Sequence, residues 1–198
     1  VRFDAFFAHA PTTLSSHTSM MSGLDPHGHA VPRNGFPIPP TVPLLAERLA
    51  AEGYDTIGVI GAGKVGRLVV ERAQALKMLP IVHDPYLSAD TIRMYGAEPV
   101  DFTELLERAD FITMHVPLTP ETANLLNAET LARVKPGCRV INSAAGGLVD
   151  EAALAEAIRS GHVAGAAIDV YAKEPPDADN PLLALDQVIC TPHLRTAT

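Results

Sequence analysis

Several residue types are scarce in this chain of 198 residues, and their scarcity limits what kind of protein it can be. There is no tryptophan, and Cys138 and Cys190 are far apart in sequence, so neither a disulfide framework nor a cysteine-rich metal site is expected. Lysine and arginine number 15 against 23 aspartates and glutamates, so no electrostatic feature favours nucleic acid or an anionic membrane as a partner. The sequence has no apolar run long enough to cross a bilayer and no signal pattern at its start. We expect a cytoplasmic protein whose two cysteines are small buried hydrophobes.

The composition changes near Tyr54. Residues 1–43 are rich in proline, histidine, serine and glycine, and a helix is expected over 43–52, ending at Gly53. From Thr56 onward, apolar runs alternate with helical patterns. The expected strands are 56–61, 79–84, 97–100, 110–115, 138–142, 163–169 and 187–190, and the expected helices are 64–77, 88–95, 103–108, 127–133 and 150–160. Asp150 is expected to cap the last helix and Gly161 to end it.

This alternation predicts an α/β fold with a parallel, doubly wound sheet of the Rossmann type over residues 56–198, preceded by a loop-rich segment over 1–55 with one helix. Hydrophobic residues make up 47% of the chain, enough for a buried core. Right-handed crossovers bring the carboxyl ends of parallel strands to one edge of the sheet. We therefore expect the functional loops at that edge.

A glycine motif lies between the first strand and the first helix, as Gly61-x-Gly63-x-x-Gly66. Gly61 permits a tight turn, Gly63 lets a pyrophosphate approach the backbone, and Gly66 lets the helix pack closely on the strand. The predicted core face of that helix consists of Val65, Leu68, Val69, Ala73 and Leu76. Asp84 ends the next strand, where its carboxylate would bind a ribose diol and repel a 2′-phosphate. This order predicts NAD rather than NADP as cofactor, the alternative being a βαβ unit that binds nothing.

Five segments, the glycine motif among them, occur in the order typical of one enzyme family. They are "GAGKVG" (61–66), "DFITMHVPLTPET" (110–122), "KPGCRVINSAAGGLVDEAALAEAI" (135–158), "GAAIDVYAKEPP" (165–176) and "VICTPHL" (188–194). From Thr56 to near its end, the chain thereby resembles the D-isomer-specific 2-hydroxyacid dehydrogenases. The resemblance implies NAD-dependent interconversion of a small 2-hydroxy acid, of the phosphoglycerate kind, and a 2-oxo acid. It also implies a homodimer.

The same resemblance implies roles for individual residues. His193 matches the family's acid/base, a task that suits a histidine because its pKa is near neutral pH. Glu174 matches the carboxylate that orients that imidazole, and Asp169 matches the residue that holds the nicotinamide carboxamide. The remaining residues implied to line the cofactor site are Lys64 and Val65 at the pyrophosphate, Val116 and Pro117 in the pocket wall, and Ser143 and Ala144 beside the nicotinamide ribose.

The chain departs from the family pattern at three points. Ala145 stands where the family has an arginine that holds the substrate carboxylate. Arg195 follows His193 where the family favours a small residue, and it would either crowd the nicotinamide or supply a displaced positive charge. No segment resembles the family's substrate domain, so we expect that domain to be missing and turnover to be impaired.

The first 55 residues resemble a different group, the alkaline phosphatase and sulfatase superfamily, through "TLSSHTSMMSG". That resemblance places Thr13 as a nucleophile with His17 beside it. The superfamily's metal-binding aspartates have no counterpart, and His27 and His29 form no carboxylate cluster, so no metal site is expected. We interpret the chain as chimeric, with a catalytically inert N-terminal segment.

Three functions follow from these patterns. The first is a 2-hydroxyacid dehydrogenase that uses His193 and Glu174, slowed by Ala145. The second is a module that binds NAD(H) without turnover. The third, a metal-dependent phosphate or sulfate ester hydrolase acting through Thr13, requires ligands that the sequence does not show.

Overall fold

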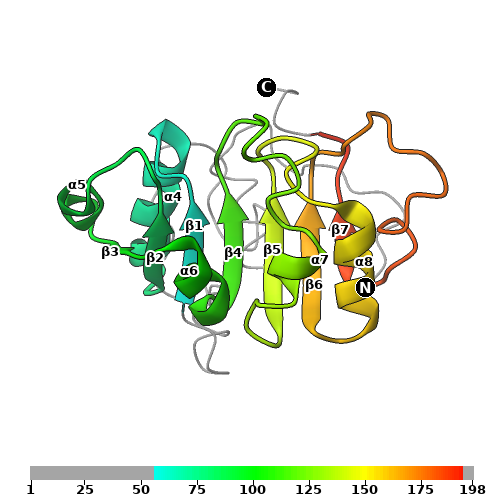
Figure 1. The fold of residues 1–198 in the computed structure, drawn as a ribbon, viewed down its shortest axis with the longest axis horizontal. Coiled ribbons are helices and arrows are strands. Elements are labelled where there is room, and N and C mark those ends of the chain that lie inside the picture. Colours follow the sequence, from blue (N-terminus) through cyan, green and yellow to red (C-terminus); the bar gives the residue numbers. More distant parts are fainter. Residues whose placement is uncertain (1–55, 194–198) are drawn as a thin grey trace, which may run out of the picture. The chain divides into compact units, whose positions relative to one another are not determined.

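A computed structural model describes residues 56–193 of the chain. Their centre is a seven-stranded sheet, ordered β3-β2-β1-β4-β5-β6-β7, in which every pair of neighbours is parallel (Figure 1). The strands are β1 (Thr56–Ile60), β2 (Leu79–His83), β3 (Glu98–Pro99), β4 (Phe111–Met114), β5 (Cys138–Asn142), β6 (Val163–Ile168) and β7 (Val188–Cys190). All seven strands expected from the sequence are present, and the doubly wound sheet is confirmed.

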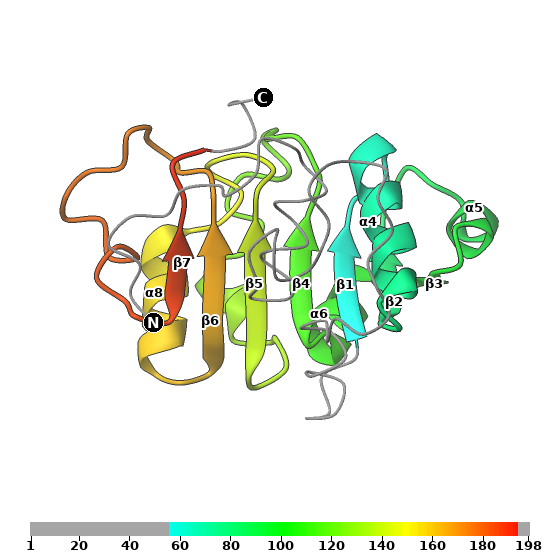
Figure 2. The same cartoon turned by 180° about the vertical axis from the view of Figure 1, so that it is seen from behind.

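Helices cover the two faces of this sheet. They are α4 (Lys64–Ala75), α5 (Ala89–Met94), α6 (Phe102–Arg108), α7 (Ala128–Leu131) and α8 (Glu151–Arg159), which match the five helices expected over 56–193. Helices α6, α7 and α8 lie in front of the sheet in Figure 1, whereas α4 lies in front of it in Figure 2, seen from behind. No helix in this part of the chain has the length and apolar character that a membrane span needs. The helix expected over 43–52 lies outside the described residues.

The strand order reverses between β1 and β4, which are neighbours at the middle of the sheet. From β1 the chain continues outward to β2 and β3, and from β4 it continues toward β5, β6 and β7 on the other side. The loops that follow β1 and β4 therefore lead to opposite halves of the sheet from neighbouring positions at its carboxyl edge. In open α/β sheets this switch point is where ligands bind.

Helix α4 is rotated relative to the face that the sequence predicted. Its buried residues are Gly66, Val70 and Ala73, whereas the side chains of Val65 and Leu68 are 57% and 40% exposed. The prediction for these two residues was wrong because it was based on hydrophobic periodicity alone. In the structure, Gly66 determines which face of α4 is buried. Only a residue without a side chain fits where α4 crosses the loop after β1, so Gly66 and the residues one and two turns later face inward.

A buried aspartate, paired with a partly exposed lysine, joins the amino ends of the central strands. The Asp110 side chain is 4% exposed; its Oδ1 accepts from Lys135 Nζ at 2.6 Å, and its Oδ2 accepts from the Thr56 amide at 3.0 Å. The Asp110 carbonyl also accepts from the Arg139 amide at 2.9 Å. One aspartate thereby links the starts of β1, β4 and β5.

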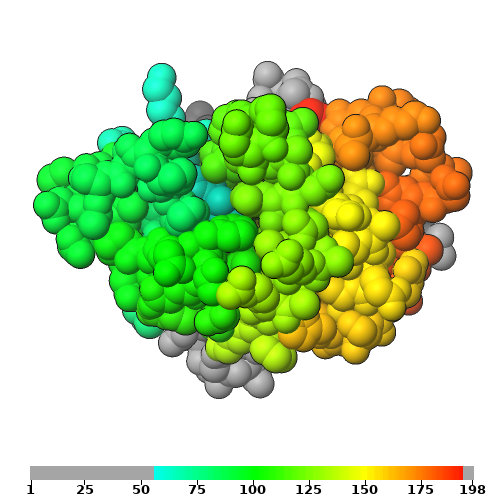
Figure 3. Space-filling view, viewed as in Figure 1, coloured from blue at the N-terminus to red at the C-terminus, as the bar shows by residue number. Residues whose placement is uncertain are grey.

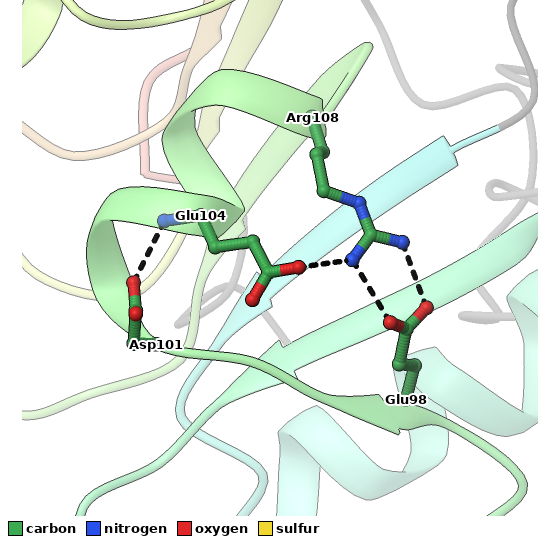
Figure 4. A network of polar contacts seen from close by, with 4 residues as sticks. All are labelled: Glu98, Asp101, Glu104 and Arg108. Carbon is green, nitrogen blue, oxygen red and sulfur yellow. Dashed lines mark hydrogen bonds and ion pairs between the residues drawn. The ribbon is translucent and has the colours of Figure 1, made fainter.

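A more exposed network fixes α6 against the edge strand β3 (Figure 4). Asp101 caps the helix by accepting from the Glu104 amide at 2.8 Å. Arg108 at the other end donates to both carboxylate oxygens of Glu98, at 2.9 and 2.8 Å, and to Glu104 at 2.5 Å. This guanidinium lowers the pKa of Glu98 through its hydrogen bonds. Both partners are about half exposed, so the pair orients α6 more than it stabilises the fold.

Both cysteines are free thiols, and they differ in burial. Cys138 is 1% exposed, and burial raises the pKa of its thiol to about 12, so it is the inert hydrophobe that was expected. Cys190, on the edge strand β7, is only half-buried, which differs from the expectation. An edge strand has a neighbour on one side only, which leaves its side chains less covered.

Replacing Asp110 tests the ion pair. Asp110→Ala removes one buried acceptor from both the Thr56 amide and the Lys135 ammonium, and we expect the free energy of unfolding to fall by about 2–3 kcal/mol. Urea denaturation followed by circular dichroism measures this free energy. Asp90→Ala is the matched control, since the Asp90 side chain is 92% exposed and its ion pair among residues 56–193 is with Arg93 on its own helix. A loss for Asp110→Ala no larger than for the control would contradict a role for the Asp110–Lys135 pair.

Candidate functional site

The glycine motif forms the loop between β1 and α4 at the carboxyl edge of the sheet. Gly61 has φ = 86°, a conformation that side chains disfavour, and its amide donates to the His83 carbonyl at 2.9 Å. A Cβ on Gly61 would lie 2.6 Å from Cγ1 of Val116, which follows β4. Val116 therefore packs directly against the loop, where it was predicted to form the pocket wall.

The start of α4 is open toward solvent. A Cβ on Gly66 would lie 1.9 Å from the Gly61 carbonyl oxygen, so the helix approaches the loop as closely as backbone allows. A Cβ on Gly63, in contrast, would have no atom within 4 Å. Gly63 is the N-cap of α4; no side chain caps the helix and its first turn has no acidic residue. Its amide groups and dipole thus suit an anion such as a diphosphate, with Lys64 and Val65 exposed beside it.

Asp84, directly after β2, contacts the glycine loop. Its Oδ2 accepts from the Ala62 amide at 2.9 Å, and its Oδ1 accepts from the Tyr86 amide at 2.9 Å. Each carboxylate oxygen has a second lone pair, so both can still accept a hydroxyl. The structure therefore brings together the diphosphate loop and the acid expected to bind the ribose, and the chemistry of these residues fits a dinucleotide.

The loop after β5 is shaped by a buried asparagine. Asn142, 2% exposed, accepts from the Ala144 amide at 3.1 Å and donates to the Ala145 carbonyl at 3.0 Å. It thereby fixes the turn that contains Ser143 and Ala144, both predicted cofactor residues. Asn142 was part of the sequence motif, yet no role was assigned to it. A polar residue ending a buried strand was the signal that could have identified it.

Asp169 directly follows β6, whose neighbours in the sheet are β5 and β7. Its amide donates to the Asn142 carbonyl at 2.9 Å, and its Oδ1 accepts from Thr191 Oγ1 at 2.5 Å. Thr191 follows β7 and also donates its amide to the Ile168 carbonyl at 3.0 Å. Thr191, which sequence reasoning missed, holds the Asp169 side chain. On the other side of the site, the Pro117 carbonyl accepts from Thr122 Oγ1 at 2.7 Å, which fixes the loop after Val116.

Glu174 and His193 form a hydrogen-bonded pair, although 19 residues separate them. His193 Nδ1 lies 2.7 Å from Glu174 Oε2, and Glu174 Oε1 accepts from the Tyr171 amide at 3.2 Å. These two hydrogen bonds lower the pKa of the Glu174 carboxyl group. His193 has φ = 55°, in the left-handed region that non-glycine residues rarely adopt. Such conformations concentrate at functional sites.

The protonation of this pair follows from the carboxylate. Because its pKa is lowered, Glu174 is ionised at neutral pH and can only accept. The hydrogen of the bond must therefore be on His193 Nδ1, so the lone pair of the neutral imidazole is on Nε2. A base whose tautomer is fixed by a carboxylate is the arrangement used for proton transfer in many enzymes.

Of the other positions discussed from the sequence, Ala145 is described by the structure and the rest lie outside the described residues. Ala145 lies in the same loop as Ser143, and the next residue, Gly146, packs against the Tyr171 carbonyl, where a Cβ would lie at 1.8 Å. The position of the family arginine is therefore next to the segment that leads to Glu174. Arg195 and the N-terminal residues Thr13, His17, His27 and His29 lie outside the described residues. Within residues 56–193, no group of three histidine, cysteine or carboxylate side chains is placed to hold a metal.

Comparison with known proteins gives one consistent family. Residues 48–194 match the model of the D-isomer specific 2-hydroxyacid dehydrogenase NAD binding domain. The chain is 50% identical over 143 residues to D-3-phosphoglycerate dehydrogenase of Mycobacterium leprae (strain TN) and, equally, to that of Bacillus subtilis (strain 168). These matches cover 72% of the chain but 27% of either relative, so the chain spans about a quarter of their length.

Solved structures agree. A glyoxylate reductase from Paecilomyes thermophila has a TM-score of 0.68 at 35% identity, covering 73% of this chain and 43% of that one. The NAD complex of a D-isomer specific 2-hydroxyacid dehydrogenase from Lactobacillus delbrueckii ssp. bulgaricus has a TM-score of 0.66 at 31% identity, covering 72% and 47%. The chain therefore belongs to the D-isomer-specific 2-hydroxyacid dehydrogenase family and contains its NAD-binding domain.

Proposed function

We propose that the chain takes part in NAD-dependent hydride transfer between a 2-hydroxy acid of the phosphoglycerate kind and the corresponding 2-oxo acid. The observation that carries this proposal is the 2.7 Å contact between His193 Nδ1 and Glu174 Oε2, at the carboxyl edge that also has the glycine loop. The substrate class is supported by relatives named D-3-phosphoglycerate dehydrogenase. A homodimer, as the family resemblance implies, is part of the proposal.

The acid/base pair supplies the proton chemistry of this reaction. In the oxidation direction, His193 Nε2 accepts the hydroxyl proton while the carbonyl bond forms at the same carbon. Glu174 keeps its negative charge and stabilises the imidazolium that results. A bound NAD would supply the hydride acceptor at this carbon, so the proton and the hydride together account for both hydrogens removed. In the reverse direction His193 returns its proton to the oxygen.

The remaining residues bind and orient. The amide groups at the start of α4, near Gly63, would hold the diphosphate, and Asp84 would accept the adenosine ribose hydroxyls. Asp169, fixed by Thr191, would hold the nicotinamide carboxamide. Val116 would form the apolar wall of the pocket, next to Gly61. These roles agree with the family match over residues 48–194.

A second candidate function is supported by Ala145. A methyl group can neither hold a carboxylate nor polarise a carbonyl, two tasks that suit an arginine because of its bidentate, charged hydrogen bonds. The chain would then bind NAD(H) through the same loop without turning over a substrate. An activity assay on a variant with the arginine restored separates these two functions.

Ala145→Arg is expected to raise the rate of NADH consumption with a 2-oxo acid. A charged donor at the reacting carbonyl contributes about 3–4 kcal/mol, so the rate should increase by two to three decades. NADH absorbance in the presence of 2-oxo acids of increasing size measures it. Adding His193→Asn to the same variant should abolish the gain.

Ala152→Arg is the matched control, because it adds the same charge on an exposed position of α8. It should leave the rate unchanged. No NADH consumption by either the parent or Ala145→Arg, despite NADH binding, would contradict the dehydrogenase and favour the binding module. Equal stimulation by both arginines would show a general charge effect instead.

Asp84 is expected to select NADH over NADPH. In Asp84→Asn, NADH should bind about tenfold more weakly, since a hydrogen bond to a charged group contributes ~1.5–3 kcal/mol. NADPH should bind more tightly, because the charge that repels its 2′-phosphate is removed. Fluorescence titration with each nucleotide measures both affinities. Asp90→Asn, exposed on α5, should change neither. An unchanged affinity ratio in Asp84→Asn would contradict the assignment of Asp84 to the ribose.

A further inference from the structure

Glu174 lies in a long segment between β6 and β7 that has no helix or strand. Two consecutive amide groups at the start of this segment each donate to a carboxylate. The Tyr171 amide donates to Glu174 Oε1 at 3.2 Å, and the Ala172 amide donates to Glu151 Oε1 at 2.7 Å. Glu151 therefore contacts the backbone directly beside the point where Glu174 is fixed.

The second oxygen of Glu151 contacts a later part of the same segment. Asn180 Nδ2 donates to Glu151 Oε2 at 2.6 Å, and Asn180 Oδ1 accepts from the Leu182 amide at 3.0 Å. Leu182 is completely buried in the core. One carboxylate thus closes the loop from residue 172 to residue 180, with Glu174 inside it. Figure 3 shows this segment, in orange, against α8, in yellow.

Glu151 is itself held on a fixed element. It is the first residue of α8, whose N-cap Asp150 accepts from the Ala153 amide at 3.0 Å. The helix packs into the core through Leu154 and Ile158, which are 0% and 3% exposed. A negative charge is also favourable at a helix N-terminus. A carboxylate on such a support can define the position of a loop that has no secondary structure of its own.

We infer that Glu151 is a positioning residue for the Glu174–His193 pair: by binding the Ala172 amide and the Asn180 side chain, it holds Glu174 where it can accept from His193 Nδ1. This role rests on the proposed function, in which His193 is the base. Glu151 itself contacts neither partner of the pair among the hydrogen bonds described. Glu151 therefore acts on the pair through the loop, and its loss should change the tautomer of His193.

The test is the tautomer of neutral His193, observed by long-range ¹H–¹⁵N NMR on the full chain at a pH where the imidazole is uncharged. His193→Gln identifies the signals, and Glu174→Gln shows their response when the acceptor charge is lost. In the parent the hydrogen should be on Nδ1. In Glu151→Ala the Nε2–H form, which an imidazole in water prefers, should rise from the minor to the major species.

Glu156→Ala is the matched control, since it removes a glutamate whose side chain is 76% exposed on the same helix. It should leave the tautomer unchanged. Should Glu151→Ala fail to fold, Glu151→Gln and Asn180→Ala apply the test. Glu151→Gln keeps one oxygen that can accept from the Ala172 amide but loses the acceptor for Asn180 Nδ2, whereas Asn180→Ala removes that contact together with the bond to the Leu182 amide. They should produce a smaller shift in the same direction.

An unchanged His193 tautomer in the folded Glu151 variants would overturn the inference. NADH titration distinguishes this result from failure of the proposed function. Glu151→Ala should bind NADH within twofold of the parent, because the hydrogen bonds described for its carboxylate are to Ala172 and Asn180 and not to the glycine loop. A parent that binds no NADH would refute the proposed function even if the tautomer responds, whereas a parent that binds NADH with an unresponsive tautomer would refute only the role of Glu151.

Discussion

The close approach of Gly66 to the carbonyl of Gly61 is the constraint on which the site depends. Because no side chain separates helix from loop at this point, only three residues lie between β1 and α4, at the edge of the sheet where the strand order reverses. The same approach sets the rotation of α4. Val70 and Ala73 face the sheet, whereas Val65 remains exposed. The glycine loop is also held by Asp84, which accepts from the Ala62 amide.

Much of this could be predicted from the sequence, because the relevant signals are local. Glycine spacing, alternating apolar runs and the Asp150 cap each depend on a few neighbouring residues, and they gave the elements of the fold between 56 and 193. The rotation of α4 could not be predicted from periodicity, since Val65 and Leu68 have the same apolar character as a core residue. The rotation is caused by a contact between the backbones of Gly66 and Gly61, and hydrophobic periodicity gives no information on such a contact.

Contacts between distant residues were also beyond the sequence argument. Glu174 and His193 were paired only through the family resemblance, since 19 residues separate them and each alone is an ordinary loop residue. Glu151 was missed because an acidic residue at a helix start is favourable in any protein. Its partners, Ala172 and Asn180, lie 21 and 29 residues away, so only the folded chain shows what it binds.

The catalytic half of the site is the part in which the chain departs from its family. The loop that contains Ala145 is held in place by the hydrogen bond from Asn142 and by the packing of Gly146 on Tyr171. The Glu174–His193 contact is present at the same edge of the sheet, and so is the contact between Asp84 and the glycine loop. Under the proposed function the acid/base pair is therefore present, while the group that would hold the substrate carboxylate is absent from its family position.

The most direct test of the account is a crystal structure of the chain with NADH. The account predicts the diphosphate against the backbone of Gly63, Lys64 and Val65, with the adenosine ribose hydroxyls on Asp84 and the nicotinamide toward Asp169. A nucleotide bound elsewhere on the sheet, or one whose diphosphate does not contact the start of α4, would contradict it.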